Sequence, residues 1–193
     1  NKYIDLISGL LSVSLGYNIK EINKKIIKQL NKGITLSLPS LLENKLAKKI
    51  INEIPSAEMV RFAKNGSDVT SAAIRLSRMI TERKIILTCG YHGWHEWYIG
   101  KTSMNAGIPN EMFINTKTFK YNDIKSFEKV FKKNKPNIAA VILEPMNVEW
   151  PNIKFLKKIR AMCSKNKSIL IFDEICTGFR FSLGGAQKLF GIT

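Results

Sequence analysis

From Met59 onward, short apolar runs rich in β-branched residues alternate with segments of helical length. The runs lie at 59–64, 84–89, 138–145 and 168–174. Helical patterns begin after Asp68, around 121 and at 152. A run that is apolar at consecutive positions has no polar face, so a strand made from it must be buried on both faces. The sequence therefore predicts an α/β fold: a mostly parallel central sheet with helices on both faces.

The first 55 residues have a different pattern. Residues 3–16 are apolar and interrupted by glycines, which suits short strands and turns better than a helix. Ile and Leu at helical spacing predict amphipathic helices at 18–33 and 40–55. We therefore expect an N-terminal segment with two amphipathic helices, 1–55, and a larger domain, 56–193.

The chain is strongly basic, with 31 Lys and Arg against 15 Asp and Glu in 193 residues. Such a balance raises nucleic acid as a partner. However, Lys supplies 25 of the positive charges, and Arg, the commonest base reader, only six. Lys, Ile and Asn together make up 67 residues, a bias that an AT-rich genome produces. We therefore expect solvated basic faces and no nucleic-acid partner.

Membrane, secreted and metal-binding classes are not favoured either. No apolar run approaches the roughly 18 residues of a membrane span, and the first residues carry no signal-peptide pattern. Cys89, Cys163 and Cys176 are widely spaced and form no C-x-x-C pair. His92 and His95 alone are too few ligands for a metal site. We expect a cytoplasmic protein without a metal and without membrane contact.

Ligands of open parallel sheets bind beyond the carboxyl ends of the strands. The run 59–64 is followed by Asn65, Gly66, Ser67 and Asp68, and then by a helical pattern. Gly66 lets the backbone approach a ligand, Ser67 offers a hydroxyl, and the first N–H groups of a helix favour a phosphate or a carboxylate. A plain turn with Asp68 as N-cap is the alternative. The two Gly-rich nucleotide-binding motifs are absent.

Aromatic residues gather after the run 84–89. Residues 91–98 hold both histidines and two of the three tryptophans of the chain. Aromatic faces stack on conjugated rings, so this segment suits a planar aromatic ligand, with a packed aromatic loop as the alternative. Trp94, Trp97 and Tyr98 fit either a substrate pocket or packing beneath that loop.

Two of the apolar runs end in carboxylates, Glu144 and Asp173. A carboxylate at the end of a buried strand is costly unless a cation or a donor meets it. An Asp that faces a pyridine nitrogen keeps this nitrogen protonated, which an electron-sink cofactor requires. Taken separately, Asp173 could instead cap the next element, and Glu144 could be exposed to solvent.

These pieces, in this order, resemble the class III, fold-type-I pyridoxal-phosphate (PLP) aminotransferases, and most closely the branch that includes glutamate-1-semialdehyde aminomutase. The residues that carry the likeness are 61–78, 90–100, 141–145 and 171–180. The last segment contains D-E-x-x-T-G-F-R after an apolar strand, which is highly specific for this family. The resemblance implies pyridoxal 5'-phosphate as cofactor and transfer of an amino group between an amino donor and a carbonyl substrate. It also implies a homodimer.

The resemblance further implies roles for individual residues. Gly66 and Ser67 would hold the cofactor phosphate. Tyr91 would stack on the pyridine ring, with His92 beside it.

The remaining implied roles fall on the carboxylate segments. Asp173 would pair with the protonated ring nitrogen, and Ile175 would pack on the opposite face of the ring. Glu144 would lie near the ring hydroxyl or the substrate amino group. Residues 174 and 177–180 would hold the geometry of the loop.

One family feature is missing from the sequence, the Schiff-base Lys on a strand after D-E-x-x-T-G-F-R. Lys188 is the only lysine after Asp173, and its surroundings match the segment before the catalytic strand. Residues 188–193 show neither a terminal helix nor a polar tail. We therefore expect an incomplete large domain with no catalytic residue of its own and no turnover alone. A non-catalytic binding or assembly module with this fold is the alternative.

Overall fold

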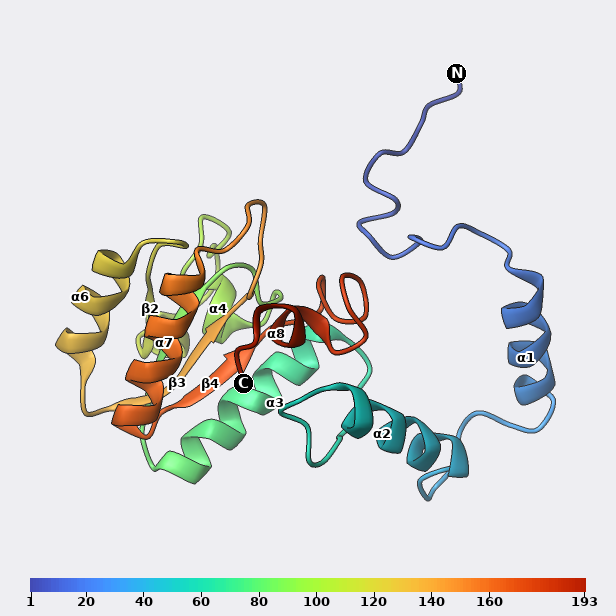
Figure 1. The fold of residues 1–193 in the computed structure, drawn as a ribbon, viewed down its shortest axis with the longest axis horizontal. Coiled ribbons are helices and arrows are strands. Elements are labelled where there is room, and N and C mark those ends of the chain that lie inside the picture. Colours follow the sequence, from blue (N-terminus) through green and yellow to red (C-terminus); the bar gives the residue numbers. More distant parts are fainter. The chain divides into compact units, whose positions relative to one another are not determined.

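The computed structural model describes all residues from Asn1 to Thr193. The chain divides into two compact units, Asn1–Ala47 and Lys48–Thr193. The division falls within the second helix, and the predicted domain limit at 55/56 stays a prediction. Figure 1 shows that the second unit holds the sheet.

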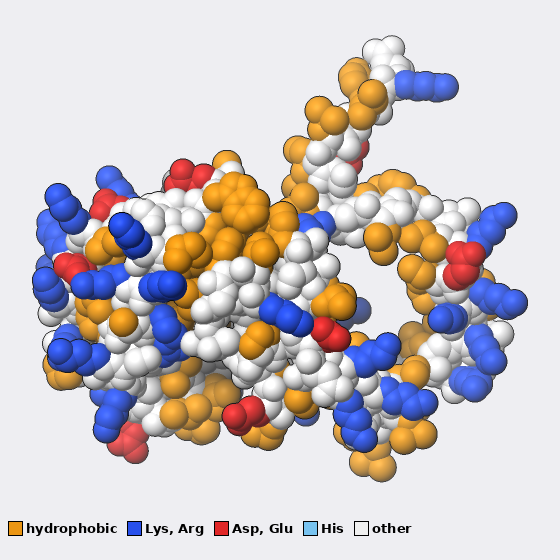
Figure 2. Space-filling model, in the orientation of Figure 1, with side chains coloured by type: hydrophobic (Ala, Val, Ile, Leu, Met, Phe, Trp, Pro, Cys, Tyr) orange, Lys and Arg blue, Asp and Glu red, His pale blue; other side chains and the backbone are white.

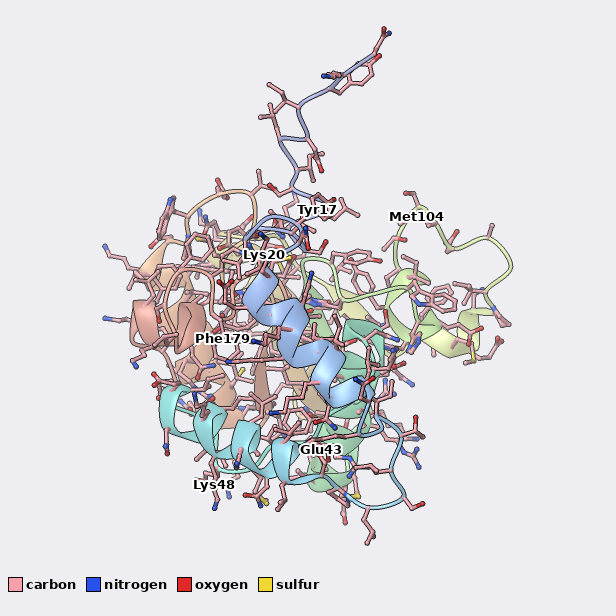
Figure 3. All side chains as sticks on the ribbon, turned by 90° about the vertical axis from the view of Figure 1, so that its right-hand side faces the viewer. Tyr17, Lys20, Glu43, Lys48, Met104 and Phe179 are labelled. Atoms are coloured by element: carbon pink, nitrogen blue, oxygen red, sulfur yellow. The ribbon has the colours of Figure 1, made fainter.

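The first unit contains turns and helix but no strand. Residues 6–15 form turns, so the expectation of short strands within 3–16 is wrong and that of turns is confirmed. Both predicted amphipathic helices form, as α1 (Lys20–Leu30) and α2 (Leu41–Glu53). The Ser40 hydroxyl caps α2 by accepting the N–H of Glu43 at 3.3 Å. In Figure 3, Lys20 and Glu43 mark the first turns of these two helices.

The second unit is built on a four-stranded parallel sheet, which confirms the predicted fold class. The strands are β1 (Ile85–Cys89), β2 (Thr116–Thr118), β3 (Ile138–Leu143) and β4 (Ile169–Phe172), in the order β2-β1-β3-β4. Every residue of β3 is fully buried. The continuous apolar pattern of β3 therefore reflects a central strand that is covered on both faces.

Helices cover the two faces of this sheet (Figure 1). On one face, α6 (Ile124–Asn134) and α7 (Ile153–Asn166) bury aromatic and aliphatic residues against β1 and β3. On the other, α3 (Gly66–Thr81) and α4 (Glu96–Ile99) pack on the same strands. The register between β1 and β3 shifts between Ile85 and Ile86. None of the helices is both long and apolar enough to cross a membrane.

The predicted strand at 59–64 does not form. A strand needs a hydrogen-bonded neighbour, and the four strands of the sheet pair only with one another. The short β2 and the short helix α5 (Asn110–Phe113) carry too few residues for a periodic pattern and were not predicted. Figure 3 shows Met104 on the loop between α4 and α5.

The C-terminal expectation is also wrong, because a short helix, α8, spans Gly185–Phe190. The residues of α8 alone do not predict this helix, because its first N–H groups are capped by a side chain from elsewhere in the chain. The Glu174 carboxylate accepts the N–H groups of Ala186 at 2.7 Å and of Gln187 at 2.9 Å. A distant side chain thus satisfies the free donors of the first helical turn.

Candidate functional site

A cavity of about 330 Å³ lies beyond the carboxyl ends of β1, β3 and β4, at the N-terminus of α3. Parallel sheets place ligands at this edge. Six of the seven predicted cofactor-binding residues line the cavity, and His92 is the one that does not. The lining residues are Asn65, Gly66, Ser67, Tyr91, Gly93, Trp94, Glu144, Asp173, Ile175 and Cys176.

The first turn of α3 forms one wall. Asn65 is the N-cap, and its side-chain oxygen accepts the N–H of Asp68 at 3.1 Å, so Asp68 is not the cap. The N–H groups of Gly66 and Ser67 precede any intrahelical acceptor and stay available to a ligand. A Cβ at Gly66 would come within 2.5 Å of Ile175. Glycine at this position thus leaves room for a close contact between two walls.

The loop after β1 is held against the same helix. The Ser67 hydroxyl accepts the N–H of Trp94 at 3.3 Å, and the Thr70 hydroxyl donates to the carbonyl of His92 at 2.9 Å. Gly93 has φ +95°, and a Cβ there would collide with Ser67. A glycine is therefore required for the backbone conformation and for the close approach.

Asp173 supplies a buried carboxylate to the cavity. It follows β4, donates its N–H to the Leu143 carbonyl at 2.9 Å and is 5% exposed. The Nδ1 atom of fully buried His92 lies 2.8 Å from Asp173 Oδ2. The Oδ1 atom accepts the N–H of Ile175 at 3.2 Å. His92 thus lies behind Asp173 and fixes its carboxylate, whereas the ring itself does not reach the cavity.

Glu144 is the second carboxylate of the site. Its Oε2 accepts the N–H of Tyr91 at 2.8 Å and the amide of Asn147 at 2.5 Å. Burial raises the pKa of the Glu144 carboxyl, and the Tyr91 N–H opposes this shift. Simple solvent exposure, one of the alternatives, does not describe this residue.

The aromatic segment divides between the cavity and the core. Tyr91 and Trp94 line the cavity with large exposed fractions, 54% and 70%. Trp97 and Tyr98 are buried, and the Tyr98 hydroxyl donates to the Gly90 carbonyl at 2.6 Å. The rings of Tyr91 and Tyr98 meet edge to face, with centroids 5.7 Å apart. Packing beneath the loop therefore describes Trp97 and Tyr98. Of the three residues, only Trp94 lines the cavity.

The segment after Asp173 holds the loop in shape. The Thr177 hydroxyl donates to Glu174 at 2.5 Å, and Arg180 Nε donates to the Cys176 carbonyl at 2.7 Å. Lys188 lies on α8 with its ammonium 3.5 Å from Glu53, and it does not line the cavity.

Three lining residues were not singled out as site residues by sequence reasoning: Asn65, Gly93 and Cys176. Asn before a glycine and a helical pattern is an N-cap signal, so Asn65 could have been found. The contact between Gly93 and Ser67 joins a loop and a helix that are far apart in sequence, and it has no local signal. Burial raises the pKa of the Cys176 thiol.

Comparison with known proteins agrees with this geometry. A family model described as aminotransferase class-III matches residues 1–193. The chain belongs to the class-III aminotransferases. It is 39% identical over 200 residues to a 3-aminobutyryl-CoA aminotransferase of Cloacimonas acidaminovorans, covering 100% of this chain and 48% of that protein. A glutamate-1-semialdehyde 2,1-aminomutase of Francisella philomiragia is also 39% identical, over 207 residues, with the same coverage.

Solved structures of this fold superpose closely on the class-III chain. The PLP internal aldimine form of the FumI protein of Sphingopyxis sp. MTA144 gives a TM-score of 0.91 at 31% identity, covering 98% of this chain and 47% of that one. A glutamate-1-semialdehyde aminomutase of Pseudomonas aeruginosa shares the fold, with a TM-score of 0.82 at 20% identity, covering 99% of this chain and 45% of that one. The chain spans about half the length of the curated relatives it matches.

Proposed function

We propose that this chain forms the cofactor-binding part of a PLP-dependent enzyme that moves an amino group between an amino donor and a carbonyl substrate. The observation that carries the proposal is the pairing of two walls around one cavity. One wall is the N-terminus of α3, which suits a phosphate, and the other presents the Asp173 carboxylate, which suits a protonated ring nitrogen.

The residues present fit this cofactor. The N–H groups and the hydroxyl at Gly66 and Ser67 hold the phosphate, and the positive end of α3 adds to the attraction. The exposed ring of Tyr91 would stack on one face of the pyridine, and Ile175 would pack on the other, since both residues line the cavity.

PLP supplies an electron sink for the carbon that carries the amino group. Asp173 keeps a proton on the ring nitrogen, since a carboxylate with little access to water stabilises a cation beside it. His92 holds the carboxylate in one orientation through the 2.8 Å contact and is therefore a positioning residue. Glu144, held by Tyr91 N–H and Asn147, would lie near the ring hydroxyl or the substrate amino group, as the family resemblance implies.

A homodimer in the cytoplasm completes the proposal, as the family resemblance implies. The apolar face of α1 supports a partner copy, because Ile22, Ile26 and Leu30 are each about half exposed. Neither nucleic acid nor a membrane takes part in this function. Aminotransferase and aminomutase chemistry remain equally compatible with the residues of the cavity.

Cofactor binding tests the proposal directly. The 25 lysines of the chain can all react with the PLP aldehyde, so the first probe is pyridoxamine 5'-phosphate, whose amine forms no imine with lysine. We expect saturable binding in isothermal titration calorimetry. Asp173→Asn keeps the side-chain shape but removes the charge, and it should weaken binding about tenfold or more.

Asp123→Asn is the matched control. Asp123 caps α6 and does not line the cavity, and Asn caps a helix equally well. This variant should bind the probe within about twofold of the parent chain. Equal binding by all three proteins, or no saturable binding to a chain with a folded circular-dichroism spectrum, would refute the proposal.

A further inference from the structure

A second hollow, which shares no lining residue with the cofactor cavity, lies at the outer edge of β2. It has a volume of about 490 Å³. It lies between β2, Lys101 just after α4, and the C-terminal half of α6. Lysines line it from three segments and no acidic residue does; they are Lys101, Lys117, Lys129 and Lys133. Figure 2 shows Lys and Arg side chains gathered on the side of the molecule where α6 lies.

None of these four ammonium groups has a carboxylate partner in the structure. Lys117 Nζ donates to the Ile114 carbonyl at 2.7 Å, and Lys101 Nζ lies 4.9 Å from the centre of the Phe113 ring. Both contacts hold an ammonium group in place without neutralising it. Four like charges around one hollow repel each other, and an anion between them removes that repulsion.

The sheet edge adds neutral donors to these charges. Strand β2 pairs only with β1, through bonds such as Ile86 N–H to Asn115 O and Phe119 N–H to Thr88 O. In a parallel ladder the bonded residues alternate, so the N–H groups of Thr116 and Thr118 point away from β1. Thr116 is 0% exposed, whereas Thr118 is exposed at the unpaired edge of the strand. The hollow therefore offers the backbone N–H of Thr118 as well as ammonium groups.

The other side of α6 provides an internal comparison. A hollow of about 480 Å³ between α6 and α7 is also lined by four lysines, among them Lys135 and Lys165. That hollow contains Glu128, which lies 2.8 Å from Lys158 and 3.5 Å from Lys132. Its positive charge is thus partly neutralised by the chain itself, whereas the charge at the β2 edge is not.

We propose that the β2-edge hollow binds a ligand that carries two or more linked phosphate groups. A single phosphate carries a charge of only about −1.5 to −2 and cannot match four cations drawn from three segments. Lys117, Lys129 and Lys133 contact the phosphate oxygens, and the exposed N–H of Thr118 donates a further hydrogen bond to them. A nucleic acid is less suited, because no aromatic side chain and no Arg lines the hollow to stack on or read a base.

The test uses inorganic tripolyphosphate as the probe and calorimetry in phosphate-free buffer at about 100 mM salt. The double variant Lys129→Gln/Lys133→Gln should weaken binding about tenfold or more. The matched control Lys135→Gln/Lys165→Gln removes the same charge from the other side of α6 and should weaken binding by less than about twofold.

Adenosine triphosphate in the same assay distinguishes two sources of linked phosphates. Affinity equal to tripolyphosphate indicates recognition of the phosphate chain, and tighter binding indicates a nucleotide; both uphold the site.

Lysine acetylation measured by mass spectrometry tests the site without any substitution. Tripolyphosphate should protect Lys117, Lys129 and Lys133 and leave Lys158 and Lys165 reactive. Equal weakening by the two double variants, absence of saturable binding, or an oligonucleotide that outcompetes tripolyphosphate and protects both hollows would each overturn the proposal. None of the substituted lysines lines the cofactor cavity, so this result is independent of the proposed function.

Discussion

Helices α1 and α6 have the same length, 11 residues, and each has one apolar face, yet they differ completely in burial. In α6, Phe127 and Phe131 are 0% and 3% exposed. In α1, Ile26 is 52% exposed, and no residue of Asn1–Ala47 is buried. The difference lies in what the apolar face meets, since α6 packs on the sheet of its own unit. An amphipathic pattern predicts a helix, but only a partner surface converts the pattern into stability.

The largest effect should come from removing one apolar side chain from each helix. Phe127→Ala should lower the free energy of unfolding by about 3–5 kcal/mol, because it leaves a cavity beside Phe119 and Phe131. Ile26→Ala should change it by less than about 1 kcal/mol, because Ile26 loses little buried area and Ala favours helix. Urea unfolding followed by circular dichroism measures both values.

Protein concentration is the control for this pair. If Ile26→Ala destabilises the chain as much as Phe127→Ala does, the contrast between the two helices is wrong in solution. A loss that appears only at high concentration would show that a second copy covers the apolar face of α1, as the proposed homodimer requires.

Two glycines, one in each unit, extend the comparison between an exposed segment and a packed one. Gly33 and Gly93 have nearly equal φ angles, +98° and +95°, but a Cβ at Gly33 meets no atom within 4 Å, whereas one at Gly93 collides with Ser67. Gly33→Ala should cost about 1 kcal/mol through backbone strain alone. Gly93→Ala should cost about 2–3 kcal/mol, because the loop must also move away from α3. Thermal or urea unfolding of the two variants gives the difference, and equal costs would show that the loop yields freely.

Much of the fold was predictable because its signals are local. The apolar runs at 84–89, 138–145 and 168–174 became β1, β3 and β4, and helical spacing located α3, α6 and α7 within a few residues. The places of Gly66 and Ser67 at a helix start and of the carboxylates after the apolar runs also follow from their positions in the chain. The structure brings these residues to one cavity, as the geometry of a parallel sheet requires.

What the sequence did not reveal depends on distant contacts. The apolar segment 59–64 has strand composition but no neighbouring strand, and α8 begins where Glu174 reaches its first N–H groups. His92 follows Tyr91 in sequence, but it points to Asp173 and away from the cavity. Composition likewise suggested evenly solvated lysines and gave no sign of the uncompensated cluster at the β2 edge.

The smallest expected effect concerns a carboxylate that burial sets apart from its exposed counterparts. Because burial raises the pKa of Glu144 in the folded chain above its ordinary value of 4.5, the folded state retains this proton at a pH where the unfolded state has lost it. The contribution of Glu144 to stability is therefore greatest below pH 4.5 and falls as pH rises through the folded pKa.

Glu144→Gln should abolish this decline, and Glu58→Gln, at an exposed position, should leave it unchanged. Urea unfolding at several values between about pH 4 and pH 7 measures the slope. An unaltered slope in Glu144→Gln would mean that Tyr91 N–H and Asn147 offset the cost of burial fully, and that folding leaves the pKa of Glu144 unchanged.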